Sequence, residues 1–383
     1  MKILFVVESY FPRTSGVPVV VKYLAEGLSN KGHDVSVVTT SIPGIPQQEK
    51  INNVNVYRFN LGKTLWKKYV GDIIEYRNFV IDFKADVTIF ECTECVTTDV
   101  LLNVLGKIKG TKILHSHGFF GMKMQMFKWN VNLKYTLGNT YNFIRLKLYY
   151  AFYLKRYIKW FDRCLCLSEV DSSRAWLEKY SNDVKILQNA VDDAFLNPTK
   201  TVDISPFCSM TLPYAVSVAT YSKIKNQVGI LREYFKSNVN CALVFIGPTE
   251  NEYFQTIKKE LTKLEHTYGK KEVYLLVSIP REYIPDIIGN AFVYLTGSAC
   301  EEYSISLIEA MSKGVPFIST NVGNARILPG GLTINKMGEM HECIDKLKRD
   351  KNLYENLSRL GKNFVAENCK RVNAVNLLEN YIL

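Results

Sequence analysis

The chain has 383 residues, 47% of them hydrophobic, and a formal net charge of +11. This length suits two domains with buried cores. No segment has the length and apolarity of a membrane-spanning helix, and we expect no signal peptide, because Glu8 interrupts the first apolar run. Nine scattered cysteines without framework spacing predict a reducing cytoplasm and exclude a disulfide scaffold.

Short apolar runs alternate with helical patterns through the first half of the chain. Val20, Leu24 and Leu28 recur on one stripe of a predicted helix over 17–30, with Pro18 in its first turn. Strand–helix alternation of this kind predicts an α/β fold with a parallel, doubly wound sheet. The predicted strands are 3–7, 35–39, 54–58, 87–90, 112–115, 164–168 and 184–187, and a further helix is predicted over 146–161.

A segment with three prolines and few periodic apolar residues, 193–213, is predicted to be a linker. A second alternating series follows it, so we expect one domain over 1–200 and another over 201–365. The second series has predicted strands at 214–218, 242–246, 273–277, 291–295 and 316–319, helices at 227–235, 253–266 and 284–289, and a helical tail from 340.

Charge is distributed unevenly along the chain. No Asp or Glu occurs between Asp99 and Asp162, an interval that holds eleven Lys and Arg and many aromatic residues. Basic and aromatic residues at helical spacing suit an anionic membrane surface. A core helix with snorkelling lysines is the close alternative. Single-stranded nucleic acid is the least favoured, and we expect no nucleic-acid partner.

Two short motifs lie near predicted strand ends. Cys92 and Cys95 form a lone C-x-x-C, for which reduced thiols are favoured over a redox or zinc role. His115 and His117 are spaced to face the same side of a strand, as two metal ligands would. No carboxylate or thiol lies near them in sequence, so we expect no metal here.

The segment 296–323 is the most informative about chemistry. It runs from a predicted strand through a loop into a helix that Gly314 and Pro316 end. Glu301 and Glu309 flank the junction between loop and helix. Open amides at a helix N-terminus can bind a diphosphate, and carboxylates accept hydrogen bonds from the vicinal hydroxyls of a sugar. The pattern favours a sugar nucleotide over an ordinary amphipathic helix with solvated carboxylates.

This stretch resembles the E-x7-E signature of glycosyltransferase family 4, the retaining enzymes of the GT-B fold. Ala310, Met311, Gly314 and Pro316 match the signature as well as the two glutamates, while 302–304 replaces the usual G-F-G. Further segments that resemble the family, in the same order, are the opening around Gly16, then 113–118, 161–169, 187–192, 216–227 and 243–248.

The resemblance implies two Rossmann-like domains facing a central cleft, with a C-terminal helix, 366–383, that returns to the first domain. It implies a retaining, metal-independent hexosyltransferase-type enzyme. The donor would be a nucleotide-sugar, with a UDP-sugar favoured over a GDP-sugar, and no separate cofactor would be needed.

The resemblance also assigns roles to residues of the second domain. Glu309 would hold the ribose hydroxyls and Glu301 the hydroxyls of the donor sugar. Lys225 and the amides near Ser304 and Ile305 would hold the diphosphate, where Lys225 meets the charge of the leaving group.

Four more positions complete the implied site. Gly16 would let the first domain's backbone approach the diphosphate, and His117 would lie beside the reacting sugar. Ser278 ends a run that lines the base. Thr220 stands where the family usually has an Arg that clamps the diphosphate, which is the largest departure from the family pattern.

Together these features predict a glycosyltransferase of bacterial surface polysaccharide biosynthesis. Its acceptor would be a polyprenyl-diphosphate-linked or other glycan, and it would be peripheral on the inner, cytoplasmic face of the cell membrane. Two alternatives stay open. A non-catalytic GT-B partner protein is suggested by Thr220 and by the altered G-F-G, and a GT-B enzyme with a soluble acceptor is suggested if the basic aromatic segment is only a core helix.

Overall fold

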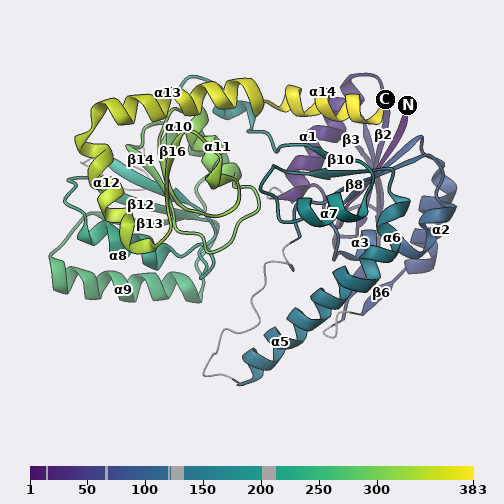
Figure 1. Ribbon diagram of the computed structural model, residues 1–383, viewed down its shortest axis with the longest axis horizontal. Helices are drawn as coiled ribbons and strands as arrows, with labels where there is room; N and C mark the ends of the chain where they lie inside the picture. Colours follow the sequence, from purple (N-terminus) through teal and green to yellow (C-terminus); the bar gives the residue numbers. More distant parts are fainter. Residues whose placement is uncertain (14–15, 65–67, 120, 122–132, 201–212) are drawn as a thin grey trace. The chain divides into compact units, whose positions relative to one another are not determined.

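The computed structural model describes residues 1–13, 16–64, 68–119, 121, 133–200 and 213–383, and these form two compact units (Figure 1). The first unit comprises Met1–Gln188 together with Arg371–Leu383, and the second comprises Asn189–Lys370. We expected boundaries at residues 200 and 365, so the second unit starts earlier and ends later than the sequence suggested. Each unit contains a parallel sheet with helices, which confirms the α/β class.

The sheet of the first unit has the strand order β10-β9-β8-β7-β1-β2-β4-β3. All neighbouring pairs are parallel except β3–β4 at the edge. Its strands are β1 (Lys2–Val6), β2 (Asp34–Thr40), β3 (Gln48–Ile51), β4 (Val54–Phe59), β7 (Val87–Glu91), β8 (Thr111–His115), β9 (Arg163–Cys166) and β10 (Val184–Ile186). A separate antiparallel pair consists of β5 (Leu61–Lys63) and β6 (Tyr69–Gly71).

The helices of the first unit include one from the end of the chain. They are α1 (Val17–Asn30), α2 (Ile73–Phe83), α3 (Val96–Asp99), η1 (Leu102–Lys107), α5 (Leu133–Leu148), α7 (Arg174–Tyr180) and α14 (Arg371–Ile382). Strands β3, β5 and β6 and helices α2, α3 and α7 were not predicted, and all of them except the 11-residue α2 have seven residues or fewer.

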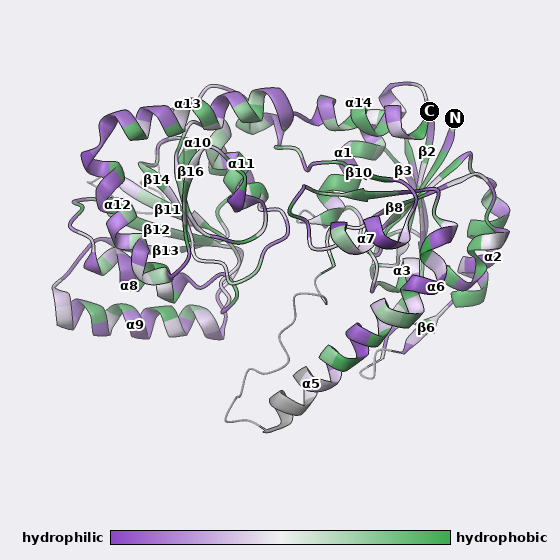
Figure 2. Ribbon diagram, in the orientation of Figure 1, coloured by the Kyte–Doolittle hydropathy of each residue, from purple (hydrophilic) through white to green (hydrophobic). Residues whose placement is uncertain are grey.

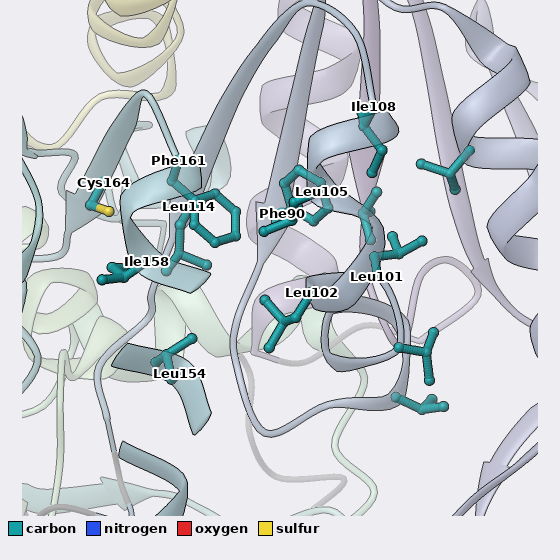
Figure 3. Close-up of a cluster of buried hydrophobic side chains, with 14 of the residues drawn as sticks. Phe90, Leu101, Leu102, Leu105, Ile108, Leu114, Leu154, Ile158, Phe161 and Cys164 are labelled. Carbon is teal, nitrogen blue, oxygen red and sulfur yellow. The ribbon is translucent and has the colours of Figure 1, made fainter. Parts of the chain in front are cut away.

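The central strands of the first sheet are buried on both faces, which explains why they appear in the sequence as continuous apolar runs. Leu4, Phe5 and Val6 of β1 are fully buried. In the core that Figure 3 shows, the ring of Phe90 packs edge-on against Phe161, with centroids 5.3 Å apart. Phe90 directly precedes Glu91, so this packing holds the end of β7, which carries a polar residue described below.

The predicted helix over 146–161 is not one regular α-helix. The chain passes from α5 into a π-helix, η2 (Tyr149–Leu154), then α6 (Lys155–Tyr157) and the 3-10 turn η3 (Ile158–Trp160). Tyr150 and Leu154 are buried, whereas Leu148 and Phe152 are 52% and 72% exposed. The segment is thus helical as far as Trp160, as predicted, but its π turns contain more residues than α turns and are not visible in an apolar pattern. Within the described ranges, no helix is long and apolar enough to cross a membrane.

Helix α14 packs on α1 within the first unit. Gly27 of α1 permits this approach, since a Cβ there would lie 2.4 Å from Cγ2 of Val375. Beyond the end of α1, Lys31 Nζ and His33 Nε2 lie 2.6 Å and 3.0 Å from the carboxylate of Glu379. The last helix is therefore held to the first unit by both close packing and charge.

The second unit has a six-stranded, fully parallel sheet of order β13-β12-β11-β14-β15-β16. Figure 2 shows its strands as mostly hydrophobic, whereas α9, α12 and α13 alternate between hydrophobic and hydrophilic residues. Its strands are β11 (Tyr214–Val218), β12 (Ala242–Gly247), β13 (Val273–Val277), β14 (Val293–Thr296), β15 (Phe317–Thr320) and β16 (Gly331–Ile334). Its helices are α8 (Gln227–Lys236), α9 (Glu252–Tyr268), α10 (Ile284–Gly289), α11 (Ile305–Ser312), α12 (Met340–Arg349) and α13 (Lys351–Asn368), with short turns η4 (Asp193–Phe195), η5 (Arg281–Tyr283), η6 (Gly323–Arg326) and η7 (Met337–Glu339).

Candidate active site

The loop that carries Glu301 connects β14 to α11 in the second unit. Ser304 is the N-cap residue of α11, and Gly314, with a φ of 73°, follows the end of that helix. A left-handed residue here favours glycine. The loop thus leaves the carboxyl end of a parallel strand and enters a helix N-terminus, which is where open α/β sheets bind ligands.

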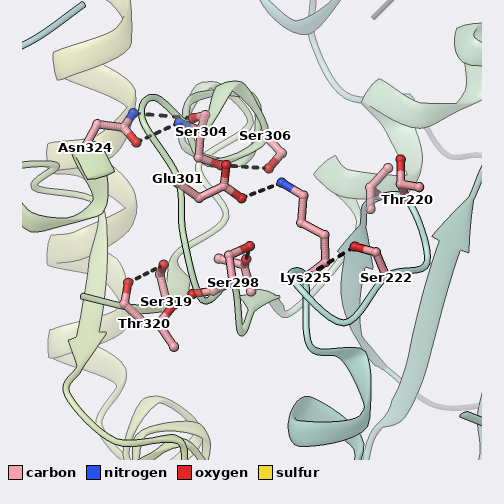
Figure 4. Close-up of polar contacts among 12 residues, drawn as sticks. Thr220, Ser222, Lys225, Ser298, Glu301, Ser304, Ser306, Ser319, Thr320 and Asn324 are labelled. Carbon is pink, nitrogen blue, oxygen red and sulfur yellow. Dashed lines mark hydrogen bonds and ion pairs between the residues drawn. The ribbon is translucent and has the colours of Figure 1, made fainter. Parts of the chain in front are cut away.

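Lys225 reaches Glu301 from the turn after β11. Its Nζ forms an ion pair with Oε1 of Glu301, which Figure 4 shows. The turn is built locally: the amide of Lys225 donates to the carbonyl of Ser222 at 3.1 Å, and Asn226, with a φ of 54°, accepts from the amide of Gly229 at the start of α8. The Lys225 and Glu301 side chains are 33% and 17% exposed, so solvent and small ligands reach the pair.

Glu309 lies in α11 and is almost fully buried. Its Oε1 accepts a hydrogen bond from Nη2 of Arg281 at 2.9 Å. Arg281 belongs to the short turn η5 after β13, and its side chain is 56% exposed. Burial raises the pKa of Glu309, and the charge of Arg281 opposes that rise. Glu301 and Glu309 are therefore each paired with a cation that follows another strand of the same sheet, β11 for Lys225 and β13 for Arg281.

The amide of Ser304 is already engaged within the second unit. It donates to Oδ1 of Asn324 at 2.8 Å. Asn324 can come this close because Gly323 precedes it, and a Cβ on Gly323 would lie 2.8 Å from the carbonyl oxygen of Glu302. A ligand at the start of α11 would therefore meet the amide of Ile305, an unpaired first-turn position of the helix, more directly than that of Ser304.

Thr220 and Ser278 lie beyond the carboxyl ends of β11 and β13. Thr220 is exposed and uncharged, and its carbonyl accepts from Nε2 of Gln227 at 3.1 Å. Ser278 has a φ of 55°, and its hydroxyl donates to the carbonyl of Pro248 at 3.0 Å. Lys225, Glu301, Glu309, Thr220 and Ser278 are thus all placed along the same edge of one parallel sheet.

Two predicted residues belong to the first unit. Gly16 is the N-cap of α1 with a φ of 66°, and an added Cβ would meet nothing within 4 Å, so its backbone is open to approach. His117, with a φ of 52°, follows β8 by two residues. Both lie at the carboxyl edge of the first sheet.

A buried carboxylate joins the two histidines. Oε2 of Glu91 lies 2.5 Å from Nε2 of His117 and 3.0 Å from Nδ1 of His115. Glu91 is the last residue of β7 and is paired with His115 of β8. We set a metal aside because no carboxylate lies near these histidines in sequence, and that premise is wrong in three dimensions. The ligand atoms of the three residues lie within 4.8 Å of one another.

Three residues of these sites were missed by sequence reasoning. Glu91 comes from β7, the strand beside β8, Arg281 comes from the turn after β13, which is not adjacent to β14, and Asn324 comes from the turn after β15. Of the three, only Glu91 could have been suspected from the sequence. It directly follows one predicted strand, and His117 lies two residues after another. That signal becomes useful once β7 and β8 are known to be adjacent.

The comparison with protein families gives two matches. Residues 14–195 match the model described as Glycosyltransferase Family 4, and residues 207–364 match Glycosyl transferases group 1. A relative from Arabidopsis thaliana, a component of phosphatidylinositol N-acetylglucosaminyltransferase, is 22% identical over 87% of this chain and 70% of the relative. An uncharacterised glycosyltransferase of Methanocaldococcus jannaschii is 48% identical over 15% of each chain.

Solved structures agree on the fold. Sucrose-phosphate synthase from Thermosynechococcus elongatus has a TM-score of 0.73 at 15% identity, covering 99% of this chain and 97% of that one. Anabaena HepE in complex with UDP has a TM-score of 0.71 at 14% identity, covering 100% and 99%. These likenesses, the two family matches and the loop with its two glutamates identify the chain as a GT-B glycosyltransferase of the family 4 type.

Proposed function

We propose that this glycosyltransferase transfers a hexose from a nucleotide-sugar with retention of configuration and without a metal ion. The observation that carries the proposal is the pairing of Glu301 with Lys225 and of Glu309 with Arg281 at one sheet edge. A nucleotide-sugar donor can replace the partner of each cation and of each carboxylate in these two ion pairs. Its diphosphate offers negative charge to the cations, and its hydroxyls offer donors to the carboxylates.

The proposed roles are those that the resemblance to the family implies. Glu309 binds the ribose hydroxyls, and Glu301 binds hydroxyls of the transferred sugar. Lys225 and the amide of Ile305, with Ser304 at the N-cap, bind the diphosphate. Charge that develops on the leaving phosphate is then met by a cation and a helix N-terminus, which together are worth several kcal/mol of barrier.

The remaining proposed contacts are less polar. In the first unit, Gly16 offers open backbone to a phosphate. In the second unit, Ser278 lies beside the base, and Thr220 lies beside the diphosphate without contributing charge. His117 lies beside the reacting sugar. We propose that the leaving phosphate takes the acceptor's proton on the same face, so no nucleophilic side chain is required.

A UDP-sugar is the favoured donor. Support comes from Anabaena HepE, which was solved in complex with UDP and with UDP-glucose at TM-scores of 0.71 and 0.68. The test is a panel of UDP- and GDP-sugars, read by thermal shift and by release of free nucleotide. Stabilisation by UDP-sugars and turnover with an acceptor extract are expected. A panel in which no nucleotide-sugar stabilises the protein would contradict the proposal.

We further propose a lipid-linked glycan acceptor, with the protein peripheral on the inner face of the cell membrane, in bacterial surface polysaccharide assembly on a polyprenyl-diphosphate carrier. Support comes from apolar side chains exposed along α5 and η2, which recur at spacings of three or four residues. These are Tyr141 (50%), Ile144 (50%), Leu148 (52%) and Phe152 (72%). The opposite side of η2 is buried, so the segment has a core face and an exposed apolar face.

Basic residues accompany this exposed face, and they are Lys147, Lys155, Arg156 and Lys159. The relative from Arabidopsis thaliana has a phospholipid, phosphatidylinositol, in its name. Each basic residue near an anionic surface contributes about 1 kcal/mol, and salt screens the attraction. The purified protein is therefore expected to float with vesicles that contain anionic lipid and to dissociate as salt is added.

Replacing those four basic residues by Gln is expected to abolish flotation without unfolding. The matched control replaces four exposed lysines of the second unit by Gln, which removes the same charge and is expected to leave flotation intact: Lys258, Lys259, Lys263 and Lys270. Flotation of the first variant at the wild-type level would show that these residues do not carry the attraction.

Two rival functions have distinct outcomes. A soluble acceptor is suggested by the synthases of sucrose phosphate and trehalose 6-phosphate among the similar structures, and it predicts no flotation at any salt. A non-catalytic partner protein is suggested by Thr220, and it predicts neither transfer nor slow hydrolysis of any nucleotide-sugar. Retention of Lys225, Glu301 and Glu309 favours an active enzyme over that rival.

A further inference from the structure

The cluster of Glu91, His115 and His117 in the first unit contains one residue with a proposed role, His117, and two without one, Glu91 and His115. Glu91 and His115 are each 1% exposed, and the side chain of His117 is 6% exposed. The pairing of β7 with β8 places Glu91 directly opposite His115, and the chain then turns so that His117 comes back over the same carboxylate. The two imidazole rings lie 3.9 Å apart, centroid to centroid.

The backbone around this cluster is held in an uncommon conformation. His117 has a φ of 52°, and Cys92 and Glu94, just beyond Glu91, have φ values of 67° and 60°. Non-glycine residues adopt this left-handed region only when their surroundings enforce it, and such residues concentrate at functional sites. The turn after β8 therefore serves to aim the ring of His117.

The hydrogen bond between Glu91 and His117 has a fixed direction. An ionised carboxylate only accepts, so the proton between Oε2 and Nε2 belongs to the imidazole. In a neutral ring the other nitrogen, Nδ1, then carries the lone pair. A carboxylate behind a histidine is a common way to select one tautomer and one ring orientation.

We propose that Glu91 is a positioning residue that holds His117 as the Nε2–H tautomer, so that Nδ1 accepts a hydrogen bond from a sugar hydroxyl at the reaction centre. This inference rests on the proposed function, which puts His117 beside the reacting sugar. The ligand class is a hydroxyl donor. Neither a phosphate nor a carboxylate suits Nδ1, since both only accept.

The charges that face His117 agree with a neutral ring. Burial and the neighbouring His115 lower the pKa of His117, against the opposing effect of Glu91 and of Asp171. Burial alone would raise the pKa of Glu91, but the two histidines outweigh burial and lower it. Asp171 is itself engaged by the amides of Leu167 and Ser173.

A metal ion is the competing explanation for two histidines and a carboxylate. Ligands of one zinc ion at bond lengths of 2.0–2.2 Å lie about 3.3 Å from each other in a tetrahedral site. Nε2 of His117 and Oε2 of Glu91 are 2.5 Å apart, which is a hydrogen-bond distance. The spacing favours the tautomer proposal and makes metal content an outcome of the test.

The first measurement is the tautomer itself. Nitrogen-15 NMR of the labelled wild-type chain, with the ring of His117 assigned from a His117→Gln variant, is expected to show a protonated Nε2 and an unprotonated Nδ1 at neutral pH. An Nδ1–H ring or an imidazolium would overturn the proposal. This readout needs no turnover, so it remains informative if the proposed glycosyl transfer itself fails.

The second measurement is the pH profile of turnover in Glu91→Gln. We expect turnover to fall roughly ten- to a hundredfold while UDP affinity is unchanged. Because the carboxylate no longer stabilises the imidazolium, the acid limb of the profile should move to lower pH. Glu91→Asp, which keeps the charge, should return the limb toward the wild-type position. An unmoved limb in Glu91→Gln would overturn the proposal.

The matched control is Glu94→Gln. Glu94 lies in the same turn but pairs with the hydroxyl of Tyr150 and not with a histidine. The acid limb of the pH profile of turnover in Glu94→Gln is expected to coincide with that of the wild type. Elemental analysis of the purified protein completes the test, and one equivalent of tightly bound zinc or manganese that is lost in Glu91→Gln would replace the tautomer proposal with a metal site.

Discussion

The two glutamates of the second unit and the two histidines of the first unit are both short motifs at strand ends, yet they differ in how much of their surroundings the sequence reveals. Glu301 and Glu309 lie on one continuous loop and helix. Their placement near a helix N-terminus could therefore be predicted from nearby Gly and Pro residues. His115 and His117 were equally visible. Their meaning changed when Glu91, 26 residues before His117, was found beside them.

The difference shows that a sequence motif is most informative when the residues that contact it lie close to it in the sequence. A strand–loop–helix segment supplies its own backbone amides and its own carboxylates. A strand end instead receives its partners from adjacent strands, and their order is set by the sheet. Even in the second unit, Arg281 and Asn324 were found only in the structure, because they come from turns after other strands, β13 and β15.

Lys225→Ala should have the largest effect on the second unit's site. It removes the cation proposed to meet the leaving phosphate and takes away the ion pair with Glu301, so turnover is expected to fall about 10²–10³-fold. Steady-state transfer assays check this. Lys223→Ala, an exposed lysine of the same turn, is the control and should retain activity. Equal loss in both variants would mean that net charge, and not the Glu301 contact, matters.

Glu309→Ala should weaken nucleotide binding by about 1.5–3 kcal/mol, because the ribose loses a charged hydrogen-bond acceptor. Calorimetry with free UDP measures the change. Glu301→Ala is the matched comparison and should reduce turnover more than UDP affinity, since Glu301 is proposed to bind the transferred sugar. Wild-type affinity in Glu309→Ala would remove Glu309 from the site.

Arg281→Gln tests a residue that only the structure revealed. At neutral pH its effect on UDP affinity should be small, about 0.2–1 kcal/mol, because the guanidinium is more than half exposed. Without Arg281 the pKa of Glu309 rises further, so Glu309 becomes protonated at a higher pH. The protonated, neutral carboxyl accepts hydrogen bonds from the ribose less strongly than the carboxylate does. UDP affinity should therefore begin to fall at a higher pH than in the wild type.

Titrations of UDP affinity between about pH 5 and 8 bracket the range where a raised carboxyl pKa would act. Arg281→Lys keeps the charge and should restore the wild-type pH dependence. If Arg281→Gln and the wild type share the same pH dependence, the ion pair with Glu309 plays no part in nucleotide binding.

Thr220→Arg should have the smallest effect. An arginine at this exposed position is expected to leave UDP affinity unchanged or to raise it by up to about 1 kcal/mol, because it adds a solvated cation near the proposed diphosphate. Thermal shift with UDP is sufficient to detect a loss. If the substitution abolished binding, the diphosphate would lie differently from the arrangement proposed here.

The sequence by itself determined the α/β class, most of the strands, and the local form of the loop from Glu301 to Glu309. These features depend on apolar periodicity and on Gly and Pro signals, which act over a few residues. The resemblance to a known family came from the same local motifs and was confirmed by matches over residues 14–195 and 207–364. The π-helix after α5 was not readable, because an extra residue per turn leaves no mark on such patterns.

The tertiary structure decided which charges meet. Arg281 reaches Glu309, Asn324 occupies the amide of Ser304, and Glu91 joins two histidines into one buried cluster. Each of these contacts links residues from different strand ends, and their proximity depends on strand order and register. Neither is encoded in any short stretch of sequence, because sheet order results from the packing of the whole unit.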